Sequence, residues 1–315
     1  MELEKIITKT QDFLSIKEEI VSSKISKSIL LITKDEQYSF EFSLMLASLL
    51  FNDGKLIENE NHLKVRSLSH PDLKIYPQKD RLMVADSDNI VEEGAIKPIF
   101  ADKKIFIIRN IDNGMEQAQN KLLKTLEEPA NNVYFILTTS NINQVLPTIR
   151  SRCNKIELKK LSPEITGSLC QGDGLVAALC DGYAGRAVKL AGNEKLHGLF
   201  DCVLNVVTRM KNSKQVLNYS KQLASYREDF DLIIEILSTI LEDLLFVKVG
   251  KLNRVRLKDE IKQLQAVEGE YTTKAIAQIQ KLLDGATKEM GYNCNFTVVI
   301  ENLLLNILEV KYICR

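Results

Sequence analysis

Residues 120–129 read Asn-Lys-Leu-Leu-Lys-Thr-Leu-Glu-Glu-Pro, and after three residues the run 133–139 reads Val-Tyr-Phe-Ile-Leu-Thr-Thr. Apolar side chains recur here at the spacing of one helix face: Ala118, Leu122, Leu123 and Leu126. We expect Asp112 or Asn113 to cap this helix and Pro129 to end it, because proline cannot continue a helix. The run 133–139 has the apolar, β-branched composition of a buried strand. Together the two segments indicate a helix that leads directly into a strand.

Similar strand-like and helix-like runs alternate on both sides of this pair. Four further strands are expected at residues 28–33, 73–76, 104–109 and 155–158. Helices are expected over 39–51 and 86–95, while the polar residues 52–63 are expected to be irregular. Strands that are separated by helices, without tight hairpins, require crossover connections. The sequence therefore predicts an α/β domain over residues 1–160, with a parallel sheet.

The character of the chain changes after Pro163. Residues 161–195 indicate a few short helices with glycine-rich breaks, which we interpret as a small helical domain. Residues 196–315 contain no proline and no strand-like alternation, and amphipathic helices are expected throughout. The chain is thus predicted to have three parts, of which the last is an all-helical domain.

Composition and charge exclude several classes of protein. Lys and Arg together number 42, as do Asp and Glu, so the chain is not a basic body that holds nucleic acid by bulk electrostatics. The most apolar stretches are interrupted by acidic residues, so no membrane association is expected. The six cysteines form no CxxC pair, and the charged first residues do not resemble a signal peptide. We expect free thiols and a cytoplasmic location.

The expected nucleotide pocket lacks the residues that bind and hydrolyse a nucleotide. A phosphate loop would follow the first strand, but residues 33–39 read Thr-Lys-Asp-Glu-Gln-Tyr-Ser and contain no glycine. Asp35 and Glu36 would repel phosphate, and Tyr38 stands at the expected lysine position. The third strand runs into Arg109 and Asn110, which cannot replace two metal-binding carboxylates. We therefore predict no cofactor and no metal at this site.

A second constellation lies near the last strand. Ser151 separates Arg150 from Arg152, Cys153 follows, and Asn141 stands at the tip of the preceding strand. The pattern alone leaves two interpretations open for the arginines, namely solvated loop residues or a guanidinium presented to a neighbour's triphosphate. Asn141 alone is typical of a helix cap.

These segments carry a resemblance to a known family. The run 120–129, the strand 133–139 and Ser151-Arg152-Cys153 together resemble the AAA+ clamp-loader subunits of bacterial DNA polymerase III. His70-Pro71-Asp72 and the glycine-rich residues 182–187 strengthen the match. In that family the gamma/tau subunit keeps the phosphate loop and the Asp-Glu pair, whereas the delta-prime subunit often loses both and keeps the SRC arginine. The sequence is similar to the delta-prime pattern. It departs from the family in having no cysteine between residues 52 and 69, where many members carry a zinc module.

The resemblance implies an AAA+ domain with a P-loop-NTPase-like parallel sheet and a degenerate nucleotide site. It also implies a small helical lid and an all-α C-terminal collar that joins subunits. It implies a role in DNA replication, as a subunit of the polymerase holoenzyme with no autonomous activity. Expected partners are gamma/tau ATPase subunits, a delta subunit, the sliding clamp and primed DNA. The implied site is the SRC motif, with Arg152 as an arginine finger acting in trans, and Arg150 as a second candidate.

Two alternatives remain. One is a gamma/tau-like ATPase with a divergent phosphate loop, and the other is an AAA+-derived scaffold that binds a different partner. Lys121 and Lys124 are candidates for DNA contact or for solvated surface charges.

Overall fold

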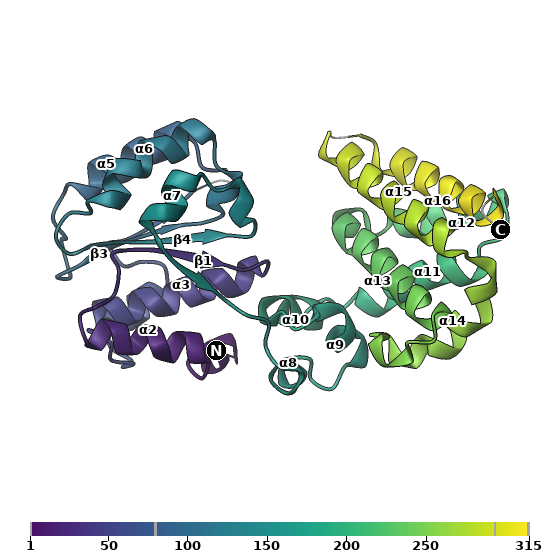
Figure 1. The fold of residues 1–315 in the computed structure, drawn as a ribbon, viewed down its shortest axis with the longest axis horizontal. Coiled ribbons are helices and arrows are strands. Elements are labelled where there is room, and N and C mark those ends of the chain that lie inside the picture. Colours follow the sequence, from purple (N-terminus) through teal and green to yellow (C-terminus); the bar gives the residue numbers. More distant parts are fainter. Residues whose placement is uncertain (1, 79–80, 293, 314–315) are drawn as a thin grey trace. The chain divides into compact units, whose positions relative to one another are not determined.

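The computed structural model describes residues 2–78, 81–292 and 294–313 (Figure 1). The chain divides into two compact units. The first is Met1–Leu169 with Gly182–Arg186, and the second is Cys170–Asp181 with Ala187–Arg315. The boundaries expected at residues 160 and 195 remain predictions. Cys314, one of the expected free thiols, lies outside the described residues.

A five-stranded parallel sheet forms the centre of the first unit. Its strands are β1 (Ser28–Ile32), β2 (Leu73–Tyr76), β3 (Lys104–Ile108), β4 (Val133–Thr139) and β5 (Asn154–Glu157), in the order β2-β3-β4-β1-β5. All neighbouring pairs are parallel, as in β1 and β4, where Ile29 lies opposite Ile136. The predicted fold class is confirmed, and all five predicted strands are present.

Helices cover both faces of this sheet, with α5 and α6 on one side and α2 and α3 on the other (Figure 1). The first unit contains α1 (Glu2–Ile7), α2 (Gln11–Val21), α3 (Glu36–Phe51), α4 (Glu60–Arg66), α5 (Val84–Gly94), α6 (Glu116–Glu127), α7 (Pro147–Arg152) and α8 (Pro163–Leu169). The rings of Phe106 and Phe135 stack with centroids 5.1 Å apart on neighbouring strands. The apolar face of α6 packs onto the same core. Because one face of this helix is buried, its apolar residues recur at helical spacing, and the helix could be predicted from the sequence.

Three local predictions were wrong or incomplete. Residues 52–63 are not irregular throughout, because Asn59 accepts the backbone N–H of His62 and starts α4. Neither Asp112 nor Asn113 caps α6, which begins at Glu116 after a separate 3₁₀ turn. The two arginines near the last strand lie in α7, not in a loop. Pro147 at the first position of this short helix favours that start.

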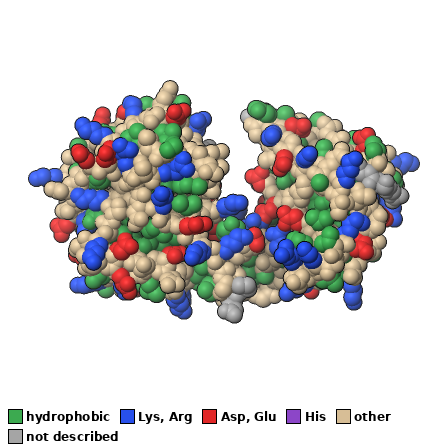
Figure 2. Space-filling model, in the orientation of Figure 1, with side chains coloured by type: hydrophobic (Ala, Val, Ile, Leu, Met, Phe, Trp, Pro, Cys, Tyr) green, Lys and Arg blue, Asp and Glu red, His purple; other side chains and the backbone are tan. Residues whose placement is uncertain are grey.

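The second unit is helical. It contains α9 (Gly174–Cys180), most of α10 (Ala184–Ala191), and α11 (Leu196–Arg209), α12 (Ser213–Ala224), α13 (Phe230–Lys248), α14 (Ile261–Val267), α15 (Thr273–Gly291) and α16 (Phe296–Ile313). Tyr271 lies in its core, and its hydroxyl donates to the carbonyl of Val207 at 2.7 Å. None of the described helices is both long and apolar enough to span a bilayer. Figure 2 shows acidic and basic side chains interspersed on the visible face.

Candidate functional site

The segment after β1 places a carboxylate where a phosphate loop would hold an anion. Asp35 is the N-cap of α3, and its Oδ1 accepts the backbone N–H of Tyr38 at 3.1 Å. Its own N–H donates to Thr33 Oγ1 at 3.2 Å, which fixes the turn. The side chain is buried. The N-terminus of α3 carries free N–H groups that favour negative charge, and Asp35 supplies that charge from within the chain.

The start of α10 closes over the same carboxylate. The N–H of Gly185 donates to Asp35 Oδ2 at 2.8 Å, and the N–H of Arg186 adds a further bond. A Cβ atom at Gly185 would lie 2.4 Å from Asp35 Oδ1 and 2.8 Å from the backbone nitrogen of Tyr38. Burial raises the pKa of Asp35 above its ordinary value, although these N–H groups favour the carboxylate. A phosphate group in this position would have to displace both the carboxylate and the backbone of α10.

The end of β3 carries no pair of acidic side chains. The Arg109 guanidinium lies 4.6 Å from the ring centroid of Phe40, and Asn110 adopts a left-handed conformation with φ 47°. Asp112 points elsewhere, since its Oδ2 accepts the N–H groups of Ser140 and Asn141 at 3.2 and 2.9 Å. This bond to the end of β4 explains why Asp112 does not cap α6. Asn141 caps a 3₁₀ turn by accepting the N–H of Asn143, as its position at a strand tip suggested.

The three residues of the SRC motif have different environments. Arg152 ends α7, and its side chain is 29% exposed. Ser151 is exposed and donates to the carbonyl of Thr148 at 3.0 Å within its own helix. Cys153 lies in the core of the sheet domain, and burial raises the pKa of its thiol to about 12. Arg152 is therefore the charged member of the motif with access to solvent, while Cys153 has a packing role.

Arg150 differs from Arg152 in its contacts. Its Nε is buried without a hydrogen-bond partner among the described residues, and the side chain is only partly exposed. Of the two lysines on α6, Lys121 forms an ion pair with Asp88, whereas Lys124 is exposed. Their contact with DNA stays a prediction.

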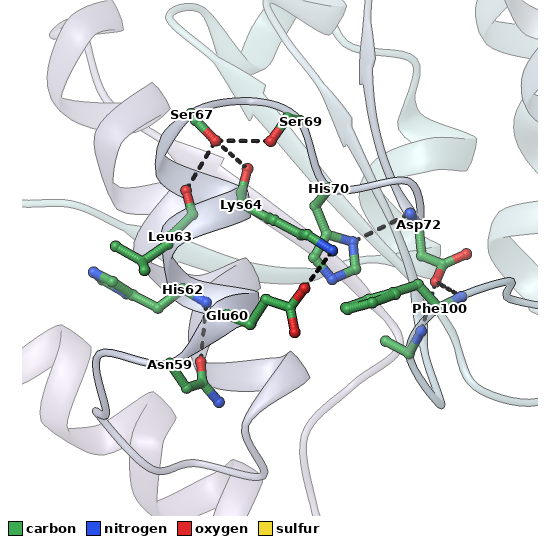
Figure 3. A network of polar contacts seen from close by, with 11 residues as sticks. Asn59, Glu60, His62, Leu63, Lys64, Ser67, Ser69, His70, Asp72 and Phe100 are labelled. Atoms are coloured by element: carbon green, nitrogen blue, oxygen red, sulfur yellow. Dashed lines mark hydrogen bonds and ion pairs between the residues drawn. The ribbon is translucent and has the colours of Figure 1, made fainter.

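His70 and Asp72 belong to a buried hydrogen-bond network that holds residues 99–101 and was not predicted from the sequence (Figure 3). Asp72 is fully buried and accepts the N–H groups of Ile99, Phe100 and Ala101 at 2.6, 2.7 and 2.7 Å. Burial raises its pKa, but these three bonds outweigh burial, so the net shift is downward.

The imidazole of His70 belongs to the same hydrogen-bond network. Its Nδ1 accepts the N–H of Asp72 at 3.1 Å, and its ring stacks on Phe51 with centroids 4.0 Å apart. Burial lowers the pKa of His70, which favours the neutral ring that this bond requires. His62 bonds Ser48 Oγ at 2.9 Å. No cluster of three potential metal ligands occurs among residues 2–78, 81–292 and 294–313.

The first unit is similar to a known protein family. A family model described as the delta subunit of DNA polymerase III matches residues 8–162. Residues 8–162 belong to this family of DNA polymerase III subunits.

Individual relatives extend the match beyond the sheet domain. The DNA polymerase III subunit delta-prime of Bacillus subtilis is 26% identical over 272 residues, which cover 79% of each chain. The subunit tau/gamma of Haemophilus influenzae is 32% identical over 104 residues, which span 33% of this chain but 15% of that protein. A gamma-subunit-related protein of DNA polymerase III from Thermotoga maritima has the same fold, with a TM-score of 0.52 at 20% identity, covering 95% of this chain and 99% of the other.

Proposed function

We propose that this chain is the delta-prime subunit of a bacterial clamp loader, a stator that hydrolyses no ATP itself. In this role it assembles with gamma/tau ATPase subunits and a delta subunit. The complex loads the sliding clamp on primed DNA. Arg152 reaches the ATP site of the adjacent ATPase subunit and stabilises charge on the transferred phosphoryl group.

One observation carries the stator part of the proposal, namely the buried Asp35 carboxylate under the start of α10. Phosphate binding at a helix N-terminus needs free N–H groups and room for the anion. Here the N–H groups of Tyr38 and Gly185 are already bonded to Asp35, and a carboxylate cannot share that space with phosphate. The loss of the acidic pair after β3 removes the groups that would hold the magnesium ion.

The arginine-finger part is supported by the position and chemistry of Arg152. Its guanidinium is partly exposed at the end of a helix, and it is planar and permanently charged. These properties suit a phosphate oxygen of another molecule. Arg150, with a buried Nε, suits that role less well.

Binding, assembly and hydrolysis measurements test the proposal. First, calorimetric titration of the isolated chain with Mg-ATP is expected to give no binding; micromolar affinity would favour the gamma/tau-like ATPase with a divergent phosphate loop. Second, the chain is expected to co-purify with the ATPase and delta subunits, and Arg152→Ala is expected to lower ATP hydrolysis by the reconstituted complex without preventing assembly. Arginine fingers contribute about 10³–10⁵ in rate in other systems, which sets an upper bound.

Controls separate the remaining alternatives. Arg81→Ala removes an exposed arginine from the same unit and is expected to leave hydrolysis unchanged. Arg150→Ala, alone and combined with Arg152→Ala, measures any shared role. Unchanged hydrolysis in all arginine variants, together with failure to co-purify, would favour a scaffold with another partner.

A further inference from the structure

Arg152 has a carboxylate partner on the neighbouring helix. Its Nε and Nη2 both donate to Glu127 Oε2, at 2.7 and 2.6 Å, and its Nη1 donates to the carbonyl of Thr148 at 3.1 Å. Glu127 is the last residue of α6, whereas Arg152 is the last residue of α7. The sequence motif 120–129 and the SRC motif therefore meet through one ion pair.

This arrangement fixes the guanidinium without using all of its donors. An arginine carries five N–H groups in a rigid plane. Two of them go to Glu127 and one goes to Thr148. Two N–H groups remain, and the side chain keeps contact with solvent. The pair thus holds the orientation of the plane and leaves donors available for a second anion.

The position of Glu127 argues against a role in helix stability alone. Glu127 and Glu128 stand at the C-terminal end of α6, where the unpaired carbonyl groups disfavour negative charge. Glu127 is also 55% exposed, and such a surface ion pair adds little to folding. What this carboxylate contributes most directly is the direction in which Arg152 points.

We propose that Glu127 is a positioning residue for Arg152, and that it orients the remaining N–H groups toward the phosphate of a neighbouring subunit's nucleotide. This inference rests on the proposed arginine-finger function. Preorganised donors stabilise a transition state without reorganisation during the reaction. Loss of Glu127 would leave the arginine charged and held only by its bond to the carbonyl of Thr148. The turnover number of the complex should therefore fall while the KM for ATP stays the same, because the nucleotide is bound mainly by its own subunit.

The test uses the reconstituted complex with Glu127→Ala, Glu127→Gln and Glu128→Gln. Glu128 is the matched control, as it is the adjacent exposed glutamate. We expect Glu127→Ala to lower kcat about fivefold, the scale of a surface ion pair. Glu127→Gln, which keeps an oxygen acceptor, should retain more activity, and Glu128→Gln should match the wild type. Combined with Arg152→Ala, the change at Glu127 should have no further effect.

Several outcomes would overturn this inference. A wild-type kcat for Glu127→Ala, or a kcat above wild type, would mean that Glu127 does not position the arginine or that it restrains it. An equal additional loss in the Arg152→Ala background would mean that Glu127 acts elsewhere. The proposed function is tested separately, since Arg152→Ala alone decides the finger role. If Arg152→Ala lowers hydrolysis and Glu127→Ala does not, only the positioning role fails.

The ¹⁵Nε resonance of Arg152 in the isolated chain gives a readout that does not depend on activity. It should shift in Glu127→Ala and stay in place in Glu128→Gln, because only Glu127 bonds that nitrogen. An unshifted resonance in Glu127→Ala would contradict the ion pair itself.

Discussion

Gly185→Ala tests directly whether the start of α10 packs closely on the Asp35 carboxylate. The added Cβ would lie 2.4 Å from Asp35 Oδ1, 2.8 Å from the Cβ of Gln37 and 2.8 Å from the backbone nitrogen of Tyr38. The latter two atoms belong to the first turn of α3, so they cannot rotate away as a flexible side chain can. The start of α10 must move instead, until these contacts reach at least 3.4 Å.

That movement sacrifices the hydrogen bond from Gly185 to Asp35, which is 2.8 Å long. A bond to a charged group contributes about 1.5–3 kcal/mol, and overpacking costs about 1–3 kcal/mol. The two costs are not additive, because breaking the bond relieves the overlap. We expect Gly185→Ala to lower the free energy of unfolding of the first unit by about 2–4 kcal/mol.

Urea unfolding, together with hydrogen exchange of the amides of residues 182–191, measures this effect. Gly192→Ala is the matched control, because a Cβ there meets only helix carbonyls at 3.6 and 3.8 Å. That substitution should be neutral or stabilise by up to about 1 kcal/mol. Equal stability and equal exchange in the two variants would refute the close packing of α10 on Asp35.

Three further outcomes follow from buried groups in the two units. Asp72→Asn should lower the free energy of unfolding at neutral pH by about 2–4 kcal/mol, as a carboxylate that accepts three N–H bonds is lost. Folding lowers the pKa of Asp72, so the stabilisation by its carboxylate is present above pH 3.8 and is lost as the pH falls through the folded value. In urea unfolding, the difference in free energy of unfolding between wild type and Asp72→Asn should therefore narrow below pH 3.8. A difference that stays constant with pH would contradict the lowered pKa of Asp72. Alkylation at mildly alkaline pH, followed by peptide mass spectrometry, should label exposed Cys294 well before Cys153, since burial raises the thiol pKa of Cys153 to about 12. Labelling of Cys153 as fast as Cys294 would mean that the core opens readily. Tyr271→Phe should lower the stability of the second unit by about 1 kcal/mol in thermal melts through loss of the bond to Val207, and an unchanged melting temperature would show that this bond adds nothing.

The strands of the sheet could be predicted from the sequence because the evidence for each strand lies within its own residues. Each buried strand is a short apolar run, and the stripe of α6 points to a single face. The errors occurred where a polar side chain had a choice of partners. Aspartate is a residue type that often caps helices, yet Asp112 accepts hydrogen bonds from Ser140 and Asn141, which lie 28 and 29 residues further along the chain. No local pattern distinguishes these two uses of an aspartate.

The candidate site shows the same division. The absence of glycine in residues 33–39 predicts that this segment forms no phosphate loop, and that prediction needs only the local sequence. The bond from Gly185 to Asp35 joins residues 150 positions apart, so it could not be predicted from the sequence. The ion pair between Glu127 and Arg152 spans 25 residues and depends on how α6 and α7 pack. Both motifs were visible in the sequence, but their contact was not.

The two carboxylates of the site stand at opposite ends of their helices, and this decides what each one can do. Asp35 lies at the N-terminus of α3, where the helix favours negative charge, and it satisfies N–H groups that would otherwise need an external anion. It therefore stabilises the closed pocket in the absence of any ligand. Glu127 lies at the C-terminus of α6, where the helix disfavours it, and it is stabilised by the guanidinium of Arg152. Removing Arg152 should therefore leave Glu127 without compensation, so Arg152→Ala should destabilise the end of α6 slightly and Arg152→Lys less. If the amides of residues 124–128 exchange at the same rate in wild type and Arg152→Ala, the pair has no energetic role, and the argument that Glu127 depends on Arg152 fails.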